Sequence, residues 1–241
     1  MRVSIVLPAF NEEKLLPSTL QAVALALPGF AERGWETEVV VCDNNSTDRT
    51  GAIAREHGAK VVFEPINQIS RARNSGASGA SGDWLVFVDA DSLPTADLFR
   101  DVARRIESGK AIGGGSTVRL EVNRRGPRFW VGCWNRLSQT FRLAAGSFVF
   151  CESAAFRAVG GFSLDLFASE EIDFSRRLRR YGRGQGKKFV ILSDHPLLTS
   201  ARKLDLYTSR EVLRFLSRAF TRPRKTLRSR EACEFWYDGR R

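Results

Sequence analysis

The sequence contains few of the residues that build disulfide-held or metal-held scaffolds, because its 241 residues include only four cysteines and two histidines. Cys42, Cys133, Cys151 and Cys233 are widely separated, without the paired spacing of a zinc knuckle. A disulfide framework is not expected either, since a reducing cytosol disfavours disulfides. Cys42 and Cys151 lie inside apolar runs, which predicts small core residues.

Long apolar runs are missing as well. No stretch of about 18 apolar residues is present, so the sequence predicts no membrane-spanning helix. The first apolar segment, Val3–Leu7, is too short for the core of a signal peptide and is typical of a buried strand. The predicted location is therefore the cytoplasm, and peripheral contact with the inner face of the membrane is an additional hypothesis.

No glycine-rich phosphate loop follows that first strand, where Pro8–Glu12 reads Pro-Ala-Phe-Asn-Glu. A Rossmann dehydrogenase would need Gly-x-Gly-x-x-Gly at this position. A sugar-1-phosphate nucleotidyltransferase would carry a glycine-rich basic loop there for the triphosphate. Signatures of helix-turn-helix, zinc-finger and ribonucleoprotein domains are also absent, so nucleic acid is not a predicted partner.

The first 118 residues alternate between short apolar runs and helix-like segments, as in parallel strands joined by helices. The predicted strands are Val3–Leu7, Glu38–Cys42, Lys60–Phe63, Trp84–Val88 and Ala111–Val118. The predicted helices are Glu12–Ala26, Asp48–His57, Ser70–Ala80 and Ala96–Ser108. This order predicts an α/β fold with a mostly parallel central sheet flanked by helices. Ligands of such sheets bind beyond the carboxyl ends of the strands, so the loops that follow the first, second and fourth runs are expected to form one site.

The fourth apolar run ends in two carboxylates, Asp89 and Asp91, separated by one residue. Alternate residues of an extended chain point the same way, so both carboxylates can converge beyond the strand end. A divalent cation with oxygen ligands, Mn²⁺ or Mg²⁺, would relieve their repulsion and retain coordination positions for phosphate oxygens. A plain Asp-rich turn is the alternative for such a motif in isolation.

The net charge of +11 is concentrated in two segments. Residues 200–241 hold 12 Lys or Arg against 5 Asp or Glu, and residues 119–142 hold 6 Arg against a single Glu. Such segments indicate attraction to an anionic partner, for example a phosphorylated acceptor or an anionic membrane, although a solvated basic surface would have the same composition. Residues 206–220 predict an Arg-rich helix that could lie on a membrane or pack on its own domain.

The second half of the chain is less regular. Ser169 is a candidate cap for a helix that begins at Glu170. Gly113–Gly115 could line an acceptor site or mark a strand irregularity. Trp130 and Trp134, four residues apart, could form a sugar-stacking or membrane-facing stripe, or they could pack in the core.

Four motifs in this order make the sequence resemble the family 2 glycosyltransferases, inverting enzymes with the GT-A fold. The first two are SIVLPAFNEEKLL and EVVVCDNNSTDRT, the second in the position of the family's Asp-Asp-Gly-Ser-Thr-Asp segment. The third, ISRARNSGASGASGDWLVFVDAD, runs from an Ala-Arg-Asn-x-Gly helix into Asp-x-Asp, and the fourth is AVGGFSLDLFASEEIDFSRRLRRYG. The resemblance extends over roughly residues 1–200. It implies metal-dependent transfer of a sugar from a nucleotide-diphospho-sugar to an acceptor hydroxyl.

The resemblance also implies which residues contact the nucleotide-sugar. They are Pro8, Ala9, Asn11, Glu12, Asp43, Asn45, Arg71, Arg73, Asn74, Asp89, Ala90 and Asp91. The Pro8–Glu12 loop and Asp43 would contact the nucleoside, while Asp89 and Asp91 would orient the ribose, the metal and the diphosphate. Asn74 would brace its loop. The family's Asp-Asp-Gly is Asp-Asn-Asn in this chain, which leaves the choice between UDP-linked and GDP-linked donors open.

Two glutamates, Glu170 and Glu171, occupy the position of the family's acidic pair. The resemblance implies that Glu171 is the general base, and Glu170 is the other candidate for this role. A carboxylate is needed because a sugar hydroxyl is a poor nucleophile until its proton is removed. Direct displacement, without a covalent intermediate, would invert the anomeric centre.

Two further candidates follow the last predicted strand. His195 could ligate the metal or contact the diphosphate, although a lone histidine is more often structural. Arg202 could bind the diphosphate or simply begin the basic surface of the tail.

These patterns predict a GT-A domain over residues 1–203 and a basic helical C-terminal extension over residues 204–241. Within the domain, residues 1–118 form the nucleotide-sugar-binding half and residues 119–203 the acceptor and catalytic half. The predicted partners are a UDP- or GDP-linked sugar and a carbohydrate or lipid-linked acceptor. The alternatives are a protein that binds sugar-nucleotides or anionic surfaces without transfer, and a sugar-1-phosphate nucleotidyltransferase.

Overall fold

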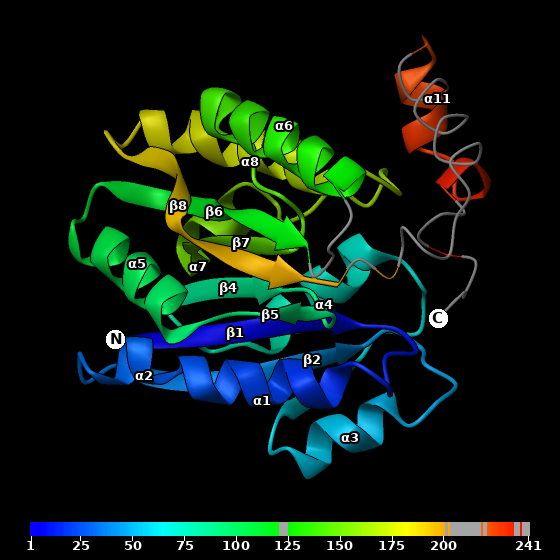
Figure 1. Ribbon diagram of the computed structural model, residues 1–241, viewed down its shortest axis with the longest axis horizontal. Coiled ribbons are helices and arrows are strands. Elements are labelled where there is room, and N and C mark those ends of the chain that lie inside the picture. The colour runs from blue at the N-terminus through cyan, green and yellow to red at the C-terminus, as the bar shows by residue number, and fades with distance from the viewer. Residues whose placement is uncertain (121–124, 201, 203–217, 219–220, 234–236, 238–241) are drawn as a thin grey trace.

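The computed structural model describes residues 1–120, 125–200, 202, 218, 221–233 and 237 (Figure 1). Its strands are β1 (Arg2–Ala9), β2 (Glu36–Asp43), β3 (Lys60–Phe63), β4 (Trp84–Val88), β5 (Ser92–Leu93), β6 (Ala111–Leu120), β7 (Phe148–Glu152) and β8 (Lys188–Thr199). Its helices are α1 (Leu16–Ala26), α2 (Pro28–Ala31), α3 (Thr50–Glu56), α4 (Ile69–Gly79), α5 (Ala96–Glu107), α6 (Arg125–Phe141), α7 (Ser153–Ala158), α8 (Glu170–Arg183) and α11 (Pro223–Leu227), with a 3₁₀ turn, η1, at Glu231–Cys233.

The strands form one mixed sheet in the order β3-β2-β1-β4-β7-β6-β8-β5. β1 pairs in parallel with β2 and with β4, and β6 pairs in parallel with β8. β7 is inserted antiparallel between β4 and β6, and β5 closes the edge antiparallel to β8. The α/β architecture predicted from the sequence is confirmed, and the antiparallel insertion of β7 is an addition to the predicted parallel order.

Helices cover both faces of the sheet (Figure 1). Successive side chains of β1 point to opposite faces of the sheet. Ile5 and Leu7 enter the core shared with α1, α2 and α5, whereas Val6 enters the core shared with α8. All three side chains are fully buried. Each such apolar side chain contributes about 1.5–3 kcal/mol through its removal from water. The sheet is therefore a rigid platform for the loops at its carboxyl edge.

The loops that follow β1, β2, β4 and β8 meet at this edge. Ala9 pairs with Asp43 at the ends of β1 and β2, and the amide of Ser200 donates to the carbonyl of Asp91 at 3.0 Å. In Figure 1 the arrowheads of β1, β6 and β8 point to the right, and α11 stands beyond that same edge. The expected convergence of the first, second and fourth loops is confirmed, and the C-terminal part of the chain joins them.

Gly113 and Gly114 are buried inside β6, between β7 and β8. A Cβ atom at Gly113 would lie 2.4 Å from the carbonyl oxygen of Phe150, and one at Gly114 would lie 2.2 Å from that of Val190. The register against β8 also shifts next to Gly113. These glycines therefore permit a close approach of strands, which supports the strand irregularity, and none of Gly113–Gly115 is on the wall of the cavities described below.

Further sequence-based predictions concern membrane-spanning helices, the C-terminal extension and two tryptophans. Within the described ranges, no helix is long and apolar enough to cross a membrane. The predicted helix over residues 206–220 and the predicted boundary at residues 203 and 204 lie outside the described residues, apart from Arg218, and stay predictions. Trp134 is half-buried against the core, whereas the side chain of Trp130 lies outside the described set.

Candidate active site

A cleft opens at the carboxyl edge of the sheet, and we call it the strand-end cleft. Its wall consists of Pro8, Ala9, Phe10, Glu12, Asn44, Asn67, Ile69, Ala72, Asp89, Ala90, Asp91 and Tyr237. The ends of β1, β2 and β4, the start of α4 and the C-terminal part of the chain all contribute. Six residues predicted to contact the nucleotide-sugar share this wall: Pro8, Ala9, Glu12, Asp89, Ala90 and Asp91.

The first loop of the cleft is held in place by hydrogen bonds to the second loop and to Arg202. The amide of Asn11 donates to the hydroxyl of Ser46 at 3.0 Å, and Asn11 Oδ1 accepts from the amide of Thr47 at 2.8 Å. Arg202 Nη2 donates to both carboxylate oxygens of Glu12, at 2.7 and 2.9 Å. Asn11 thus stabilises the loop and is not on the cleft wall. Arg202 contacts the cleft wall through its hydrogen bonds to Glu12.

The second loop presents a different residue to the cleft than the sequence predicts. Asp43 Oδ1 accepts from the amide of Ser46 at 3.0 Å, so this carboxylate is held within its own turn. Asn44 lies on the cleft wall, and its side-chain amide donates to two backbone carbonyls. Asn45 is exposed with φ of 64°, a left-handed conformation that asparagine tolerates better than most residues. The wall residue of this loop is therefore Asn44, and neither Asp43 nor Asn45.

Beneath the cleft, the fully buried Arg73 of α4 joins two acidic side chains. Its Nη1 donates to Glu170 Oε1 at 2.6 Å, and its Nη2 donates to Asp89 Oδ1 at 3.0 Å and to the carbonyl of Gly146 at 2.8 Å. Burial disfavours the charged guanidinium, but the carboxylates of Asp89, Glu170 and Glu171 outweigh it and hold the pKa of Arg73 above its ordinary value. Arg73 thereby fixes the orientation of Asp89.

A second cavity adjoins the cleft, and we call it the glutamate pocket. Its wall consists of Ile69, Arg73, Asp89, Gly146, Ser147, Phe167, Ala168, Ser169, Glu170 and Glu171. Ile69 and Asp89 belong to the walls of both cavities. A ligand that extends from one cavity into the other would therefore lie next to Asp89, with Asp91 on the wall of the first cavity and Glu171 on the wall of the second.

The two glutamates at the start of α8 have different environments. Glu170 is buried, and its carboxylate is engaged in the ion pair with Arg73. Glu171 is half-buried. Its own burial, together with the negative charge of Glu170, raises the pKa of Glu171 to about 8. A carboxylate with a raised pKa is a stronger base, as removal of a proton from a hydroxyl group requires.

Ser169, on the wall of the glutamate pocket, was predicted to cap α8. It does precede the helix, but its hydroxyl makes no capping hydrogen bond, and its φ is 63°. A left-handed conformation of a residue other than glycine costs on the order of 1–3 kcal/mol and is found most often at functional sites. The predicted cap is therefore wrong, and Ser169 instead turns the chain sharply into α8.

Asn74 links α4 to the loop before α8. Its Nδ2 donates to the carbonyl of Phe162 at 2.9 Å, and its Oδ1 accepts from the amide of Phe162, also at 2.9 Å. Gly161 lies against this pair, and a Cβ atom there would come within 2.6 Å of Asn74 Oδ1. Asn74 thus braces the loop. Arg71, by contrast, is on the wall of neither cavity among the described residues, and its contact stays a prediction.

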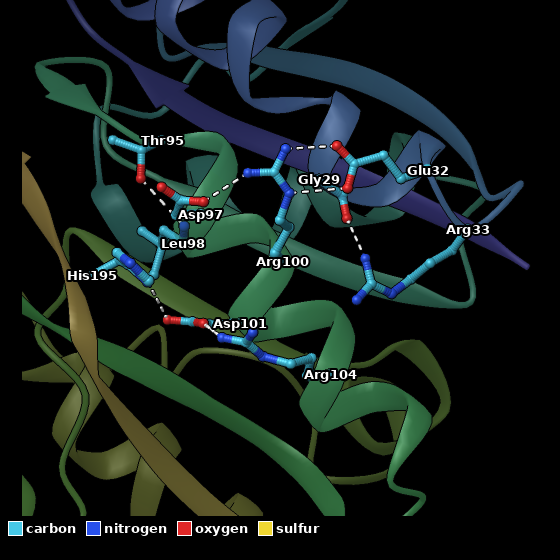
Figure 2. A network of polar contacts seen from close by, with 10 residues as sticks. All are labelled: Gly29, Glu32, Arg33, Thr95, Asp97, Leu98, Arg100, Asp101, Arg104 and His195. Carbon is cyan, nitrogen blue, oxygen red and sulfur yellow. Dashed lines mark hydrogen bonds and ion pairs between the residues drawn. The ribbon is translucent and has the colours of Figure 1, made fainter.

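His195 lies away from the two cavities. Its Nδ1 is 2.9 Å from Asp101 Oδ2 on α5, and Asp101 also pairs with Arg104 (Figure 2). His195 sits four residues before the end of β8, where the register against β6 shifts. His195 is on the wall of neither cavity in the described part of the chain, and its metal-ligand assignment stays a prediction.

The described residues contain no group of three or more His, Cys, Asp or Glu side chains arranged to hold a metal ion. Asp89 and Asp91 alone nevertheless fit Mg²⁺ or Mn²⁺, which binds nucleotides through one or two protein carboxylates together with phosphate oxygens and water. Both carboxylates lie on the wall of the strand-end cleft. The donor set therefore fits a cation that arrives with a diphosphate.

The model of the family described as Glycosyl transferase family 2 matches residues 4–159, which is more than half of the chain. The chain belongs to this family. The matched range includes the strand ends, Arg73 and the Asp89–Asp91 pair, whereas Glu170 and Glu171 lie beyond it. The matched range thus covers the wall of the strand-end cleft except Tyr237, whereas the two glutamates of the glutamate pocket depend on the geometry above.

Curated relatives are similar to this chain over about half of its length. An uncharacterized glycosyltransferase of Mycobacterium tuberculosis is 34% identical over 113 residues, covering 46% of this chain and 47% of that protein. Dolichol-phosphate mannosyltransferase of Pyrococcus furiosus is 32% identical over 124 residues, covering 48% of this chain and 33% of that protein. The chain spans about half, or less, of the length of these relatives.

Solved structures resemble this chain over most of its length. TarS of Staphylococcus aureus in complex with UDP-GlcNAc has a TM-score of 0.67 at 20% identity, covering 99% of this chain and 71% of that chain. A mannosyltransferase from Pyrobaculum calidifontis in complex with GDP-Man and Mn²⁺ has a TM-score of 0.63 at 19% identity, covering 88% and 59%. At such identity the likeness establishes the fold, and the predicted GT-A fold is confirmed.

Several wall residues were not among the predicted site residues. Phe10, Asn44, Asn67, Ile69 and Ala72 lie beside predicted positions in the cleft, and the first two belong to loops that the sequence did point to. Gly146 and Phe167 carry no local signal of a functional role. Tyr237 could not be found from the sequence, because it follows the predicted domain by more than thirty residues.

Proposed function

We propose that the chain transfers a sugar from a nucleotide-diphospho-sugar to an acceptor hydroxyl, with inversion and with a divalent cation. The observation that carries this proposal is the shared wall of the two cavities at Asp89. A donor whose diphosphate lies at Asp89 and Asp91 would direct its sugar toward the glutamate pocket. An acceptor hydroxyl in that pocket would then lie between the sugar and a basic carboxylate.

The residues of this chain divide the chemistry between them. Asp89 and Asp91 would hold the cation, and Mn²⁺ or Mg²⁺ bound there would neutralise charge on the departing diphosphate. Arg73 keeps the Asp89 carboxylate oriented, and the ion pair with Glu170 keeps Arg73 in place. Glu171 accepts the proton of the acceptor hydroxyl, whose oxygen then attacks the anomeric carbon from the side opposite the diphosphate. One direct displacement inverts the anomeric centre.

Glu171, and not Glu170, is assigned as the base. Glu170 already forms a buried ion pair with Arg73, and moving its carboxylate to a substrate would leave Arg73 without this partner. The raised pKa of Glu171 and its position on the pocket wall suit proton transfer instead.

The donor class is a UDP- or GDP-linked sugar. TarS binds UDP-GlcNAc, and the Pyrobaculum mannosyltransferase binds GDP-Man with Mn²⁺. In this chain, Asn44 replaces a family carboxylate on the cleft wall, and its side-chain amide is already donated to backbone carbonyls. The second loop therefore offers the base mainly backbone groups, which suits either nucleotide.

Asp91→Asn tests the cation site. In Mn²⁺, a nucleotide-sugar at about 100 times its dissociation constant should add about 2.7 kcal/mol to the unfolding free energy of the wild type, or roughly 5–10 °C in Tm. We expect the variant to lose most of this shift, because the cation loses one of its two carboxylates. Thermal unfolding with UDP-GlcNAc, UDP-glucose and GDP-mannose, each with Mn²⁺ or with EDTA, measures the effect.

Asp97→Asn is the matched control for that experiment, since Asp97 lies on the exposed face of α5 and pairs only with Arg100 among the described residues. An equal shift in wild type and Asp91→Asn would remove Asp91 from the cation site. A nucleotide-sugar bound by the wild type but never turned over with any acceptor would favour the alternative of a binding protein.

The acceptor is proposed to be lipid-linked and to be reached at an anionic membrane surface. Support comes from the end of α6, where Leu137 and Phe141 are 45% and 55% exposed. Arg136 and Arg142 are exposed beside them and form no ion pair within the described ranges. Arg179 of α8 donates to the carbonyl of Phe141, which brings α8 to this face. Apolar and basic side chains together suit the interface of an anionic bilayer.

Vesicle co-sedimentation tests the membrane contact. Each arginine near an anionic surface contributes about 1 kcal/mol, so Arg136→Gln/Arg142→Gln should weaken binding to phosphatidylserine-containing vesicles at least about tenfold. Leu25→Ser, at an exposed position of α1, is the control for a surface change elsewhere. If the wild type sediments no better with anionic than with neutral vesicles, the membrane contact is withdrawn, while the transfer proposal stands.

A further inference from the structure

Tyr237, near the C-terminus, lies on the wall of the strand-end cleft. Its hydroxyl is 3.5 Å from the amide of Ile69, at the start of α4, and can accept a hydrogen bond from it. Its ring packs edge-to-face on Phe167, with ring centroids 5.7 Å apart and planes at 78°. Arg230 covers the ring at 5.8 Å. The phenol therefore has defined neighbours on several sides.

The described C-terminal residues are attached to the segment that precedes α8. The amide of Phe167 donates to the carbonyl of Leu227 at 2.8 Å, and Arg228 pairs with Asp165 at 3.4 Å. Gln68 holds the same segment from the other side, because its Nε2 donates to two backbone carbonyls there, at 2.8 and 3.0 Å. Tyr237 is thus positioned by contacts that begin at α4.

Tyr237 and Phe167 stand where the two cavities meet. Phe167 belongs to the wall of the glutamate pocket, Tyr237 to the wall of the strand-end cleft, and Ile69 to both. Tyr237 contacts both Ile69 and Phe167, and the walls of the two cavities also share Asp89. A donor that extends from the cleft into the pocket would bring its sugar to this junction.

We propose that Tyr237 contacts the sugar of the bound donor and, with Phe167, shields its anomeric carbon from water. This inference rests on the proposed function. Aromatic rings offer a large apolar surface to the C–H faces of a sugar, and closing a site to water prevents hydrolysis of the donor. In hydrolysis, a water oxygen would bond to the anomeric carbon as the bond to the diphosphate breaks, releasing free sugar, the nucleoside diphosphate and a proton.

Binding measurements separate a sugar contact from a merely structural role. Affinities of wild type, Tyr237→Phe and Tyr237→Ala are measured in Mn²⁺ for UDP and GDP, and for UDP-GlcNAc, UDP-glucose and GDP-mannose. Tyr237→Ala should lose about tenfold in affinity for the preferred nucleotide-sugar and less than about twofold for its nucleoside diphosphate. Tyr237→Phe should remain close to wild type, because it keeps the ring. Hydrolysis of the donor without an acceptor should rise several-fold in Tyr237→Ala.

Tyr181→Ala, at an exposed position of α8, is the matched control and should change none of these values. If Tyr237→Ala folds poorly, Phe167→Leu gives a second measurement with the same expected pattern. An equal loss for nucleoside diphosphate and nucleotide-sugar, or no loss for either, overturns the role of Tyr237 while the proposed function stands. Failure of the wild type to bind any of the five ligands overturns the proposed function and this inference with it.

Discussion

Replacing Glu171 by Gln is expected to lower the rate of sugar transfer by about 10²–10⁴-fold, the usual contribution of a general base. Gln has nearly the shape of Glu and does not accept the proton of the acceptor hydroxyl. Donor binding should change little, because the proposed position of the diphosphate is at Asp89 and Asp91. Single-turnover transfer and donor titration, measured on the same preparation, separate the two effects.

The pH dependence adds a second readout to the same variant. Since the pKa of Glu171 is raised to about 8, the wild-type kcat/KM should increase as pH rises toward 8 and the carboxyl group loses its proton. Stability should move the other way. The folded pKa lies above the unfolded value, so the protonated carboxyl stabilises the fold below pH 4.5, and this contribution is lost as pH rises through about 8. Glu171→Gln should remove both dependences.

Asp173→Asn is the matched control, since Asp173 lies on the same helix, two residues further along, and pairs with Arg177. It should keep near-wild-type transfer and the wild-type pH profile. Transfer at the wild-type rate by Glu171→Gln would exclude Glu171 as the base, and loss of transfer only in Glu170→Gln would move the assignment to Glu170.

Arg73→Met is expected to cost about 3–5 kcal/mol of unfolding free energy, because it leaves buried carboxylates without a compensating charge. Glu170 is the main source of this cost, since its side chain is buried and its ion pair with Arg73 is 2.6 Å long. Asp89 is more exposed, so water can solvate part of its charge. Urea denaturation measures the loss as a shift of the midpoint at constant slope.

A double variant makes the interpretation specific. Glu170→Gln in the Arg73→Met background should restore part of the stability, because it removes the uncompensated charge. Arg100→Met is the control, because Arg100, on the exposed face of α5, pairs with Glu32 and Asp97 in water, where ion pairs contribute little to stability. Additive losses in the double variant, or equal losses at Arg73 and Arg100, would contradict a buried charge network.

Much of the fold could be predicted because apolar runs and the polar residues that end them are patterns of neighbouring residues. Apolar runs such as Trp84–Val88 bury both of their faces, and the chain that follows them must turn, which places polar residues at the strand ends. The antiparallel β7 could not be predicted in the same way, since an apolar run of five residues has no direction until its neighbours are known. Its partners, β4 and β6, lie well before it in the sequence.

The sequence predicted which loops form the site better than it predicted which side chains face the cleft. Asp43 and Asn44 are adjacent, and only the turn that captures the Asp43 carboxylate puts Asn44 on the cleft wall. His195 follows a strand as a metal ligand could, yet the carboxylate it meets is that of Asp101, on a helix 94 residues earlier. Side-chain direction depends on neighbours that sequence spacing does not identify.

The sequence by itself determined that this chain forms an α/β sheet with polar loops at one edge, and that Asp89 and Asp91 lie there together. Periodicity and strand ends are properties of consecutive residues, so they can be derived from the chain alone. The tertiary structure distinguishes the two glutamates, because Glu170 meets Arg73 across 97 residues, while burial raises the pKa of Glu171 and supports it as the proposed base. It also decided that Tyr237 reaches the cleft across 168 residues, since burial and charge pairing depend on residues that only folding brings together.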